Sequence, residues 1–351
     1  MGFPNQIGSS FLETLCKAYD LGSPCDSIPM PGTRNRNLVV RTDRGEWFVR
    51  NRYGGYSEPG RISFDHEAVK FLSARGVPVV LPLSNTDGAS FTTYDGAIWE
   101  IYPFVEGTPF LEGDAGLFKA LGAAVAGFHE AGRGFPLRCN KLAPRGETDP
   151  AVIFQQIETI ERGNPACASV LHWYRTWTSD ATKVLPDAAF RRLPHTLVHG
   201  DLQTANIIVN GDRIAAFVDL DWCAWQPRIY DLAFAVLFCC STHKTPIRGD
   251  DIWSLTQPPI LTHESVEAFL QSYQAHTSPF SHHEMRALRS QAILSWCHSR
   301  VAGALKVPPQ DRSAFLSRPP DSLHSMLSAW SKSRGGTVPN SCTRTRNRAR
   351  P

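Results

Sequence analysis

The chain has 351 residues, of which 42% are hydrophobic and 20% are charged, a composition typical of a globular protein with a sizeable core. Its formal net charge of +3 comes from the last twenty residues, which carry six Lys or Arg and no acidic residue. Subtracting these six charges leaves the rest of the chain at −3. A mildly acidic body excludes a broad basic surface for nucleic acid, so we expect no nucleic-acid partner.

The sequence contains no recognisable membrane or secretion signal. No apolar stretch reaches the length of a membrane helix, and the start of the chain lacks the charged and apolar regions of a signal peptide. The nine cysteines form no C-x-x-C pair, and Cys239-Cys240 lies in an apolar run typical of a core. We therefore expect a cytoplasmic protein without a membrane partner. The basic segment 332–351 is expected to be a disordered, solvated end that could also touch an anionic partner.

The first hundred residues alternate between helix and strand signals. Ser9 or Ser10 could cap a first helix that ends near Gly22. Asp43-Arg44-Gly45 has the composition of a hairpin turn between two β-rich runs of a sheet that opens after Pro31-Gly32. The further elements expected here are strands over 38–40, 47–50, 79–81, 91–94 and 97–102, and a helix over 63–74.

After Gly107 the pattern changes to apolar residues at helical spacing. We expect helices over 117–128, 152–160, 166–184, 232–240, 266–273 and 284–305. His129 is interpreted as structural, and His282 and His283 as surface residues because neighbours on a helix point to different sides. The sequence thus predicts an α+β protein in which a small sheet precedes a larger, mainly helical part.

One stretch, His199 to Asp231, concentrates polar side chains around a predicted hairpin. Two short β-rich runs flank Asn210-Gly211, whose residues tolerate the positive φ of a two-residue turn. Asp201 and Asn206 stand before the hairpin, and Asp219 stands at its exit. Because a hairpin brings its two ends together, these three side chains should converge.

Three oxygen-bearing side chains in one place suit a hard cation such as Mg²⁺, which prefers carboxylate or carbonyl oxygens together with phosphate and water. Asp201 and Asn206 also match D-x-x-x-x-N, in which the Asp accepts a hydroxyl proton and the Asn holds a metal ion during phosphoryl transfer. That spacing alone occurs by chance in many chains, and a polar turn with an ordinary hairpin is the alternative. His199-Gly200 before it and Asp219 after it favour the catalytic interpretation.

The segments HGDLQTANIIV, FVDLD and YDLA together resemble the aminoglycoside phosphotransferase and choline kinase superfamily, which consists of small-molecule kinases. The resemblance spans about Phe11 to Trp330. GTRNRNLVVRTDRGEWFV, AGRGFP and the long C-terminal helices are most similar to type II homoserine kinases. It implies a two-lobed, protein-kinase-like fold. The N-terminal lobe would be a small antiparallel sheet plus helix and would cover residues 1–103. A mainly helical C-terminal lobe would cover residues 104–331. The disordered tail would cover residues 332–351.

The resemblance also implies roles for the motif residues. Asp201 would accept or orient the proton of the substrate hydroxyl, while Asn206 and Asp219 would hold Mg²⁺ against the phosphates of ATP. Catalysis would then consist of positioning and electrostatic stabilisation. His199 would brace the loop. Asp231, at the start of an apolar helix, would accept hydrogen bonds from the backbone or from His199 beneath the loop.

Nucleotide-binding residues follow from the same resemblance. The run W-F-V-R, ending at Arg50, is similar to the V-A-I-K strand, so Arg50 would take the place of the phosphate-pairing Lys, with Arg52 on the same face as the alternative. Glu67, in the first turn of the predicted helix, is the candidate partner of Arg50, or an acid stabilised by the helix dipole. Pro103 and Val105 lie in the expected hinge, where Pro103 can only accept a hydrogen bond from adenine and Val105 can donate one.

The resemblance also concerns one loop and two residues after Asp219. Pro31 to Asn37 stands in the place of the phosphate-covering loop but lacks G-x-G-x-x-G, so only its backbone amides and Asn side chains suit phosphates. Asp221 replaces the Gly of D-F-G, and it could add charge near the metal or contact the substrate. Trp222 could line the acceptor site or pack in the core.

The expected activity is transfer of the γ-phosphoryl group of ATP to a hydroxyl of a small molecule. Asp219 and Asp231 are only twelve residues apart, which leaves no room for the activation loop of a protein kinase. The homoserine-kinase-like layout favours an amino acid or amino alcohol as acceptor, and an aminoglycoside or another hydroxylated amine is the alternative. A nucleotide-binding pseudokinase without turnover is the rival of another class. A metal-dependent hydrolase built on H-G-D would need more His ligands than this stretch offers.

Overall fold

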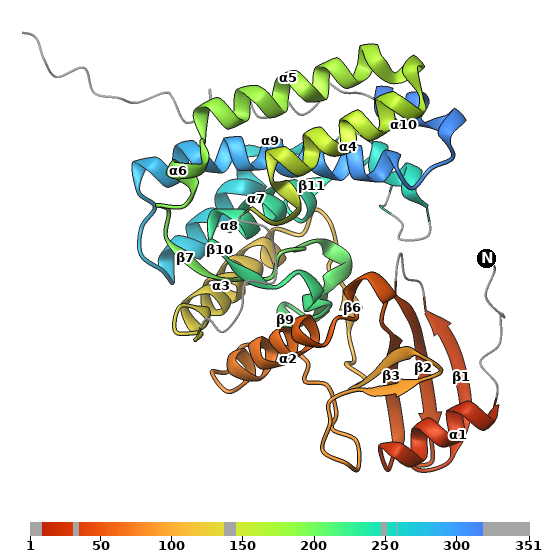
Figure 1. Ribbon diagram of the computed structural model, residues 1–351. Helices are drawn as coiled ribbons and strands as arrows, with labels where there is room; N and C mark the ends of the chain where they lie inside the picture. The colour runs from red at the N-terminus through yellow and green to blue at the C-terminus, as the bar shows by residue number, and fades with distance from the viewer. Residues whose placement is uncertain are drawn as a thin grey trace, which may run out of the picture.

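The computed structural model describes residues 9–30, 35–136, 145–245, 247, 251–257 and 259–318. A sheet with two helices forms one end of the molecule, and a larger group of helices forms the other (Figure 1). The α+β architecture predicted from the sequence is therefore confirmed. The predicted basic tail 332–351 lies outside the described residues, as does the first part of the predicted phosphate-covering loop, residues 31–34.

Five antiparallel strands form the N-terminal sheet in the order β1-β2-β3-β5-β4. Their bounds are Pro24–Met30 for β1, Arg36–Thr42 for β2, Gly45–Asn51 for β3, Thr92–Tyr94 for β4 and Ala97–Pro103 for β5. The β2–β3 hairpin turns at the predicted place, where Thr42 pairs with Gly45. β1 was not predicted, because it is a largely exposed edge strand that contains two Pro residues and lacks an alternating apolar pattern.

Helix α1 (Ser9–Ala18) covers this sheet with an apolar face. Phe11 and Leu15 are buried in one cluster with Val40 and Val49 of the sheet. Helix α2 (Pro59–Ser73) begins four residues before the predicted start at Ser63, because Pro59 occupies a favoured position in the first turn. The predicted strand over 79–81 is wrong: its only bridge joins Val79 to Phe217.

The chain leaves the N-terminal sheet after Pro103. Gly107 has a φ of +156°, and a Cβ there would lie 2.6 Å from the backbone oxygen of Val209, so the backbone passes directly against β8. β6 (Thr108–Pro109) then joins β8 (Ile207–Asn210) and β9 (Arg213–Phe217) in a separate antiparallel sheet. We propose that the boundary between the lobes lies between residues 103 and 104, where the chain changes sheets.

The second lobe contains every long helix predicted for it. The helices are α3 (Ala115–Gly132), α4 (Pro150–Gly163), α5 (Ala168–Val184), α6 (Asp187–Phe190), α7 (Ile229–Phe238), α8 (His263–Ala275), α9 (His282–Ala304) and α10 (Arg312–Ser317). Two-stranded sheets pair β7 (His195–Val198) with β10 (Ala224–Pro227) and β11 (Ser241–Thr242) with β12 (Ile260–Leu261). Across the described ranges, no helix has the length and apolar character needed to cross a bilayer.

Short 3-10 helices connect these elements. They are η1 (Gly54–Tyr56), η2 (Gly146–Thr148), η3 (Pro165–Cys167), η4 (Thr204–Asn206), η5 (Leu220–Trp222), η6 (Ile252–Thr256) and η7 (Pro309–Asp311). Helix α9 begins at a capping box in which Ser281 and Glu284 bond each other's backbone. His282 and His283 are exposed, as predicted.

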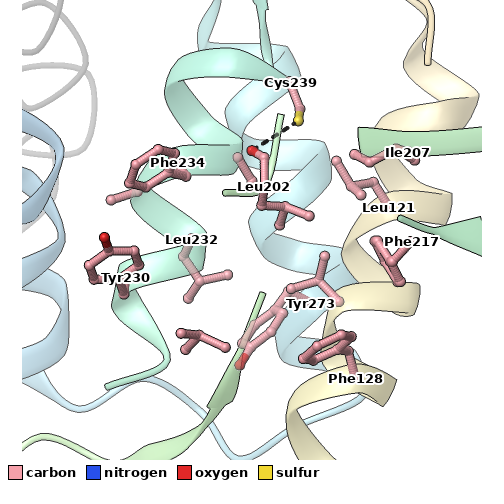
Figure 2. Packing of buried hydrophobic residues seen from close by; sticks show 14 of the residues in the cluster. Leu121, Phe128, Leu202, Ile207, Phe217, Tyr230, Leu232, Phe234, Cys239 and Tyr273 are labelled. Atoms are coloured by element: carbon pink, nitrogen blue, oxygen red, sulfur yellow. Dashed lines mark hydrogen bonds between the residues drawn. The ribbon is translucent and has the colours of Figure 1, made fainter. Parts of the chain in front are cut away.

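The main hydrophobic core lies between α3, α7 and α8 and under the β8–β9 hairpin (Figure 2). Helices α3 and α8 approach closely because Gly122 has no side chain; a Cβ there would lie 2.4 Å from the backbone oxygen of Phe269. Leu202, in the segment between β7 and β8, is buried in this core, and Figure 2 shows its carbonyl oxygen accepting a hydrogen bond from Cys239 Sγ at 3.5 Å. The prediction that Cys239-Cys240 belongs to the core is confirmed.

Candidate active site

The segment 199–206, which we call the catalytic loop, brings Asp201 and Asn206 together. Asp201 Oδ2 accepts hydrogen bonds from Gln203 Nε2 at 2.9 Å and from Asn206 Nδ2 at 3.0 Å. Because the amide nitrogen of Asn206 is committed to Asp201, its Oδ1 is the atom that could serve as a metal ligand. Burial raises the pKa of Asp201 above its usual value.

Asp219 follows β9 at the other end of the hairpin. The backbone N–H of Val218 donates to Asn206 O at 3.0 Å, so the hairpin brings the segment carrying Asp219 to the catalytic loop. Asp219 has a φ of 59°, a left-handed conformation that Asp adopts more readily than most non-glycine residues. Burial and the neighbouring carboxylate of Asp221 raise the pKa of Asp219 to about 7.

A buried carboxylate supports the catalytic loop from below. Asp231 accepts hydrogen bonds from the backbone N–H groups of His199 at 2.6 Å and Gly200 at 2.9 Å, the position that the sequence predicts for it. His199 Nε2 lies 3.0 Å from Val218 O and joins the loop to the strand before Asp219. His129 Nε2, 3.1 Å from Asp231 Oδ2, adds a contact that the sequence did not predict. Its only sequence signal is a single His on an otherwise apolar helix face.

Arg50 extends from β3 to the metal-binding end of the hairpin. Its side chain is buried, with Nη1 3.2 Å from Asp219 Oδ1 and Nη2 2.9 Å from the Tyr102 hydroxyl. Nη2 also lies 3.1 Å from Asp221 Oδ1. Arg50 thus lies beside Asp219, and its pairing with the phosphates stays a prediction.

The predicted pairing of Arg50 with Glu67 is wrong. Arg50 Nε donates to Glu100 Oε2 at 2.8 Å, because the β3–β5 register sets Arg50 directly opposite Glu100 and their side chains share one face. Since α2 starts at Pro59, Glu67 lies beyond the first turn and is exposed. In residues 97–103, the alternation of side chains between the two faces of the strand is the sequence signal that could have identified Glu100.

Asp221 is buried among arginines instead of facing a substrate. It is 3% exposed, and it accepts hydrogen bonds from Arg52 Nη2 at 2.5 Å and from Asn35 Nδ2 at 3.1 Å. Arg52 Nη2 also pairs with Asp65 Oδ2 at 2.7 Å, which links α2 to η5. Of the two readings of Asp221, this burial favours added charge near the proposed metal site over a contact with the substrate.

Trp222 lies at the boundary between the catalytic loop and α2. Its side chain is half-buried, and the Arg61 guanidinium of α2 lies over its ring at 5.0 Å. Arg61 Nη2 also donates to the backbone oxygen of Asp221 at 3.1 Å. On the opposite side, Gly200 has a φ of +85°, and a Cβ there would lie 2.1 Å from Trp222 O. Trp222 thus packs between the catalytic loop and α2.

The buried ion cluster around Arg50 has an excess of negative charge. Although burial opposes ionisation, Arg50 and a hydrogen bond from His66 lower the pKa of Glu100 to about 2. Two arginines, Arg50 and Arg52, face three buried carboxylates, those of Glu100, Asp65 and Asp221, and Asp219 adds a fourth.

Glu100→Gln is expected to destabilise the fold by about 3 to 5 kcal/mol at pH 7, because it breaks the buried pair in which Arg50 Nε and His66 Nε2 bond this carboxylate. The folded pKa of Glu100 is about 2, below its ordinary value of 4.5. Its contribution is therefore complete above about pH 5 and is lost as pH falls toward 2. Chemical denaturation of both proteins from pH 7 to pH 3 should show the difference shrinking. A difference that stays constant over this range would contradict the assignment.

Comparisons with known proteins agree with this geometry. A protein-family model described as "Phosphotransferase enzyme family" matches residues 29–288 of this chain. The chain is 25% identical over 333 residues to a homoserine kinase of Bradyrhizobium sp. (strain BTAi1 / ATCC BAA-1182), with 92% of each protein covered. The structure resembles an amicoumacin kinase in complex with AMP-PNP and Ca²⁺ at a TM-score of 0.63 and 16% identity, covering 92% of this chain and 94% of that one. It also resembles a microcompartment-associated aminopropanol kinase at a TM-score of 0.61 and 15% identity, covering 93% and 99%.

These likenesses confirm the two-lobed kinase-like fold predicted from the sequence. The family match covers well over half of the chain, including the N-terminal sheet and the catalytic loop. The chain therefore belongs to the phosphotransferase enzyme family and is a small-molecule kinase.

Proposed function

We propose that this protein transfers the γ-phosphoryl group of ATP to a hydroxyl of a small acceptor that also carries an amino group, an amino acid or an amino alcohol. The observation that carries the proposal is the convergence of Asp201, Asn206 and Asp219 beside the buried Arg50. A proton acceptor, two oxygen ligands and a cation for phosphate are the parts that phosphoryl transfer requires.

The residues at this site fit a magnesium ion. Among the described residues, no group of three or more His, Cys, Asp or Glu could hold a metal alone, as a dedicated protein cage would require. Mg²⁺ usually takes only one or two carboxylates and completes its shell with phosphate and water. Asp219 and the Oδ1 of Asn206 would hold it. When bound, the ion offsets charge on the phosphates.

Nucleotide contacts are proposed for the strand and hinge around β5. Arg50 would exchange its contact with Asp219 for a phosphate oxygen, while Glu100 and Tyr102 keep its guanidinium in place. Pro103 ends β5 and has no N–H, so only its carbonyl oxygen can bond adenine. The N–H of Val105 makes no hydrogen bond within the described part of the chain, which suits it to bond the adenine edge.

In the reaction, Asp201 accepts the proton of the acceptor hydroxyl as the oxygen attacks the γ-phosphorus. Its hydrogen bonds to Gln203 and Asn206 fix the carboxylate before substrate binds, so orientation is established in advance. Asp231 and His199 act only through the loop that they hold. The same complete set of residues argues against the rival pseudokinase, which would have no need of a positioned base.

The acceptor class draws support from the relatives, whose names include a homoserine kinase and an aminopropanol kinase. Homoserine and aminopropanol are both small hydroxylated amines. An aminoglycoside or another hydroxylated amine is the second candidate, supported by the structural likeness to an amicoumacin kinase.

The test is an ADP-release assay on the full chain with Mg²⁺-ATP and a panel of acceptors: L-homoserine, 3-aminopropan-1-ol, kanamycin and glycerol. We expect release to rise with one of the first two compounds and to vanish when EDTA removes the metal. Replacement of ATP by GTP shows which nucleotide is the donor. Nucleotide binding without ADP release for any acceptor would favour the pseudokinase.

A further inference from the structure

The carboxylate that holds Arg50 has a second buried partner on its other oxygen. Glu100 Oε2 lies 2.8 Å from Arg50 Nε and 2.7 Å from Arg50 Nη2. Its Oε1 lies 2.8 Å from Nε2 of His66, a residue of α2. An ionised carboxylate can only accept hydrogen bonds, so His66 Nε2 carries a proton and donates it. The two oxygens of Glu100 thus connect a helix, α2, with a strand, β3.

The imidazole of His66 is itself held at its other nitrogen. Nδ1 lies 2.6 Å from Oγ of Ser90, which stands shortly before β4. His66 is buried, and Ser90 is half-buried. A serine hydroxyl can donate to Nδ1 while Nε2 donates to Glu100, so both ring nitrogens have a hydrogen-bond partner. Two partners at opposite corners of the ring fix its orientation, and with it the direction of the bond to Glu100.

The orientation of the Glu100 carboxylate decides where Arg50 points. Rotation of this carboxylate would move Oε2 out of the fork formed by Nε and Nη2 of Arg50, and the hydrogen bond from His66 to Oε1 opposes that rotation. Glu100 is fully buried, so loss of this donor would leave Oε1 unsatisfied. The remaining nitrogen of the guanidinium, Nη1, lies 3.2 Å from Asp219 Oδ1. Helix α2 therefore acts on Arg50 through His66 and Glu100, although the direct pairing with Glu67 is wrong.

We propose that His66 is a positioning residue for nucleotide binding: by fixing the Glu100 carboxylate, it holds the Arg50 guanidinium in the orientation that pairs with phosphate. This inference rests on the proposed function, in which Arg50 binds a phosphate oxygen, and deepens it by naming what aims that arginine. A guanidinium aimed before the nucleotide arrives loses less freedom on binding, which raises affinity. Because His66 acts only through Glu100 and Arg50, it affects the affinity for the nucleotide and leaves that for the acceptor unchanged.

The test compares His66→Asn with His66→Gln. An Asn side chain places a polar atom near the position of Nδ1, whereas a Gln side chain places its amide nitrogen near the position of Nε2 and can still donate to Glu100. We expect His66→Asn to raise the KM for Mg²⁺-ATP about tenfold or more, the size of a lost hydrogen bond to a charged group, with the KM for the acceptor unchanged. His66→Gln should recover most of this loss. His172→Asn, at an exposed position of α5, is the matched control and should have no effect.

Calorimetric titration of Mg²⁺-AMP-PNP into the full chain separates this inference from the proposed function, because it needs neither acceptor nor turnover. Weaker binding to His66→Asn that His66→Gln restores would uphold the inference even if no acceptor gave ADP release. Equal binding to the wild type and His66→Asn, an equal loss in both variants, or no binding to the wild type would overturn it.

Ser90 provides a second test in case neither His66 variant folds. Ser90→Ala removes the partner of His66 Nδ1, and we expect it to weaken AMP-PNP binding about threefold, the size of a lost neutral hydrogen bond. Ser90→Thr keeps the hydroxyl and should restore the affinity. Unchanged binding to a folded Ser90→Ala would then overturn the proposal.

Discussion

Asp201→Asn is expected to lower kcat by a factor of about 10² to 10⁴, because the hydroxyl proton then has no acceptor in the transition state. The fold should persist, since an asparagine keeps one oxygen to accept the hydrogen bonds that Gln203 and Asn206 donate to Asp201. Nucleotide binding should also persist, because the proposed phosphate and adenine contacts lie elsewhere. The measurements are ADP release with the best acceptor of the panel and calorimetric binding of Mg²⁺-AMP-PNP.

The matched control for this variant is Asp212→Asn. Asp212 lies in the exposed turn of the β8–β9 hairpin, and its substitution removes the same charge from the same lobe. Its kcat should equal that of the wild type. A small loss of activity in Asp201→Asn, of less than about threefold, would show that Asp201 is not the proton acceptor. Loss of nucleotide binding together with activity would point to a structural role instead.

Gly200→Ala is expected to cost about 2 to 5 kcal/mol of stability and most of the activity. Gly200 has a φ of +85°, which is strained for an alanine, and the added Cβ would lie 2.1 Å from Trp222 O. Relief of that overlap must move the catalytic loop or η5, and with it Asp201 or Asp219. Chemical denaturation measures the first effect, and ADP release measures the second.

Gly211→Ala separates the two causes. Gly211 also has a positive φ, +63°, but no atom lies within 4 Å of a Cβ placed there. It should cost only the backbone strain, about 1 to 2 kcal/mol, and leave kcat unchanged. If both variants lose stability and activity equally, the contact between Gly200 and Trp222 has no special role.

Local signals in the sequence were sufficient for the parts of the site that are close in the chain. The sequence predicts a turn at Asn210-Gly211, and the structure has it one residue later, at Gly211-Asp212, because Asn210 still pairs with Arg213. A hairpin must bring its ends together, so the approach of the Asp219 segment to the catalytic loop followed from spacing. The support by Asp231 followed from the family resemblance, and a carboxylate in an apolar helix does need hydrogen-bond donors.

The partners of a buried side chain depend on strand register and on the rotation of helices. They could not be predicted in the same way. The prediction that Glu67 pairs with Arg50 relied on the strand and the helix that kinases place side by side. The true partner, Glu100, is set by the pairing of β3 with β5, fifty residues apart in sequence. One residue of strand register reverses which side chain faces inward.

The sequence by itself determined the α+β class, the order of sheet and helices, and the residues that meet at the β8–β9 hairpin, since each depends on contacts between near neighbours in the chain. Only the tertiary structure decided that Asp221 is buried between Arg50 and Arg52 and that His129 joins Asp231. These contacts bring together distant elements whose relative positions depend on how the whole core packs, which no local pattern encodes.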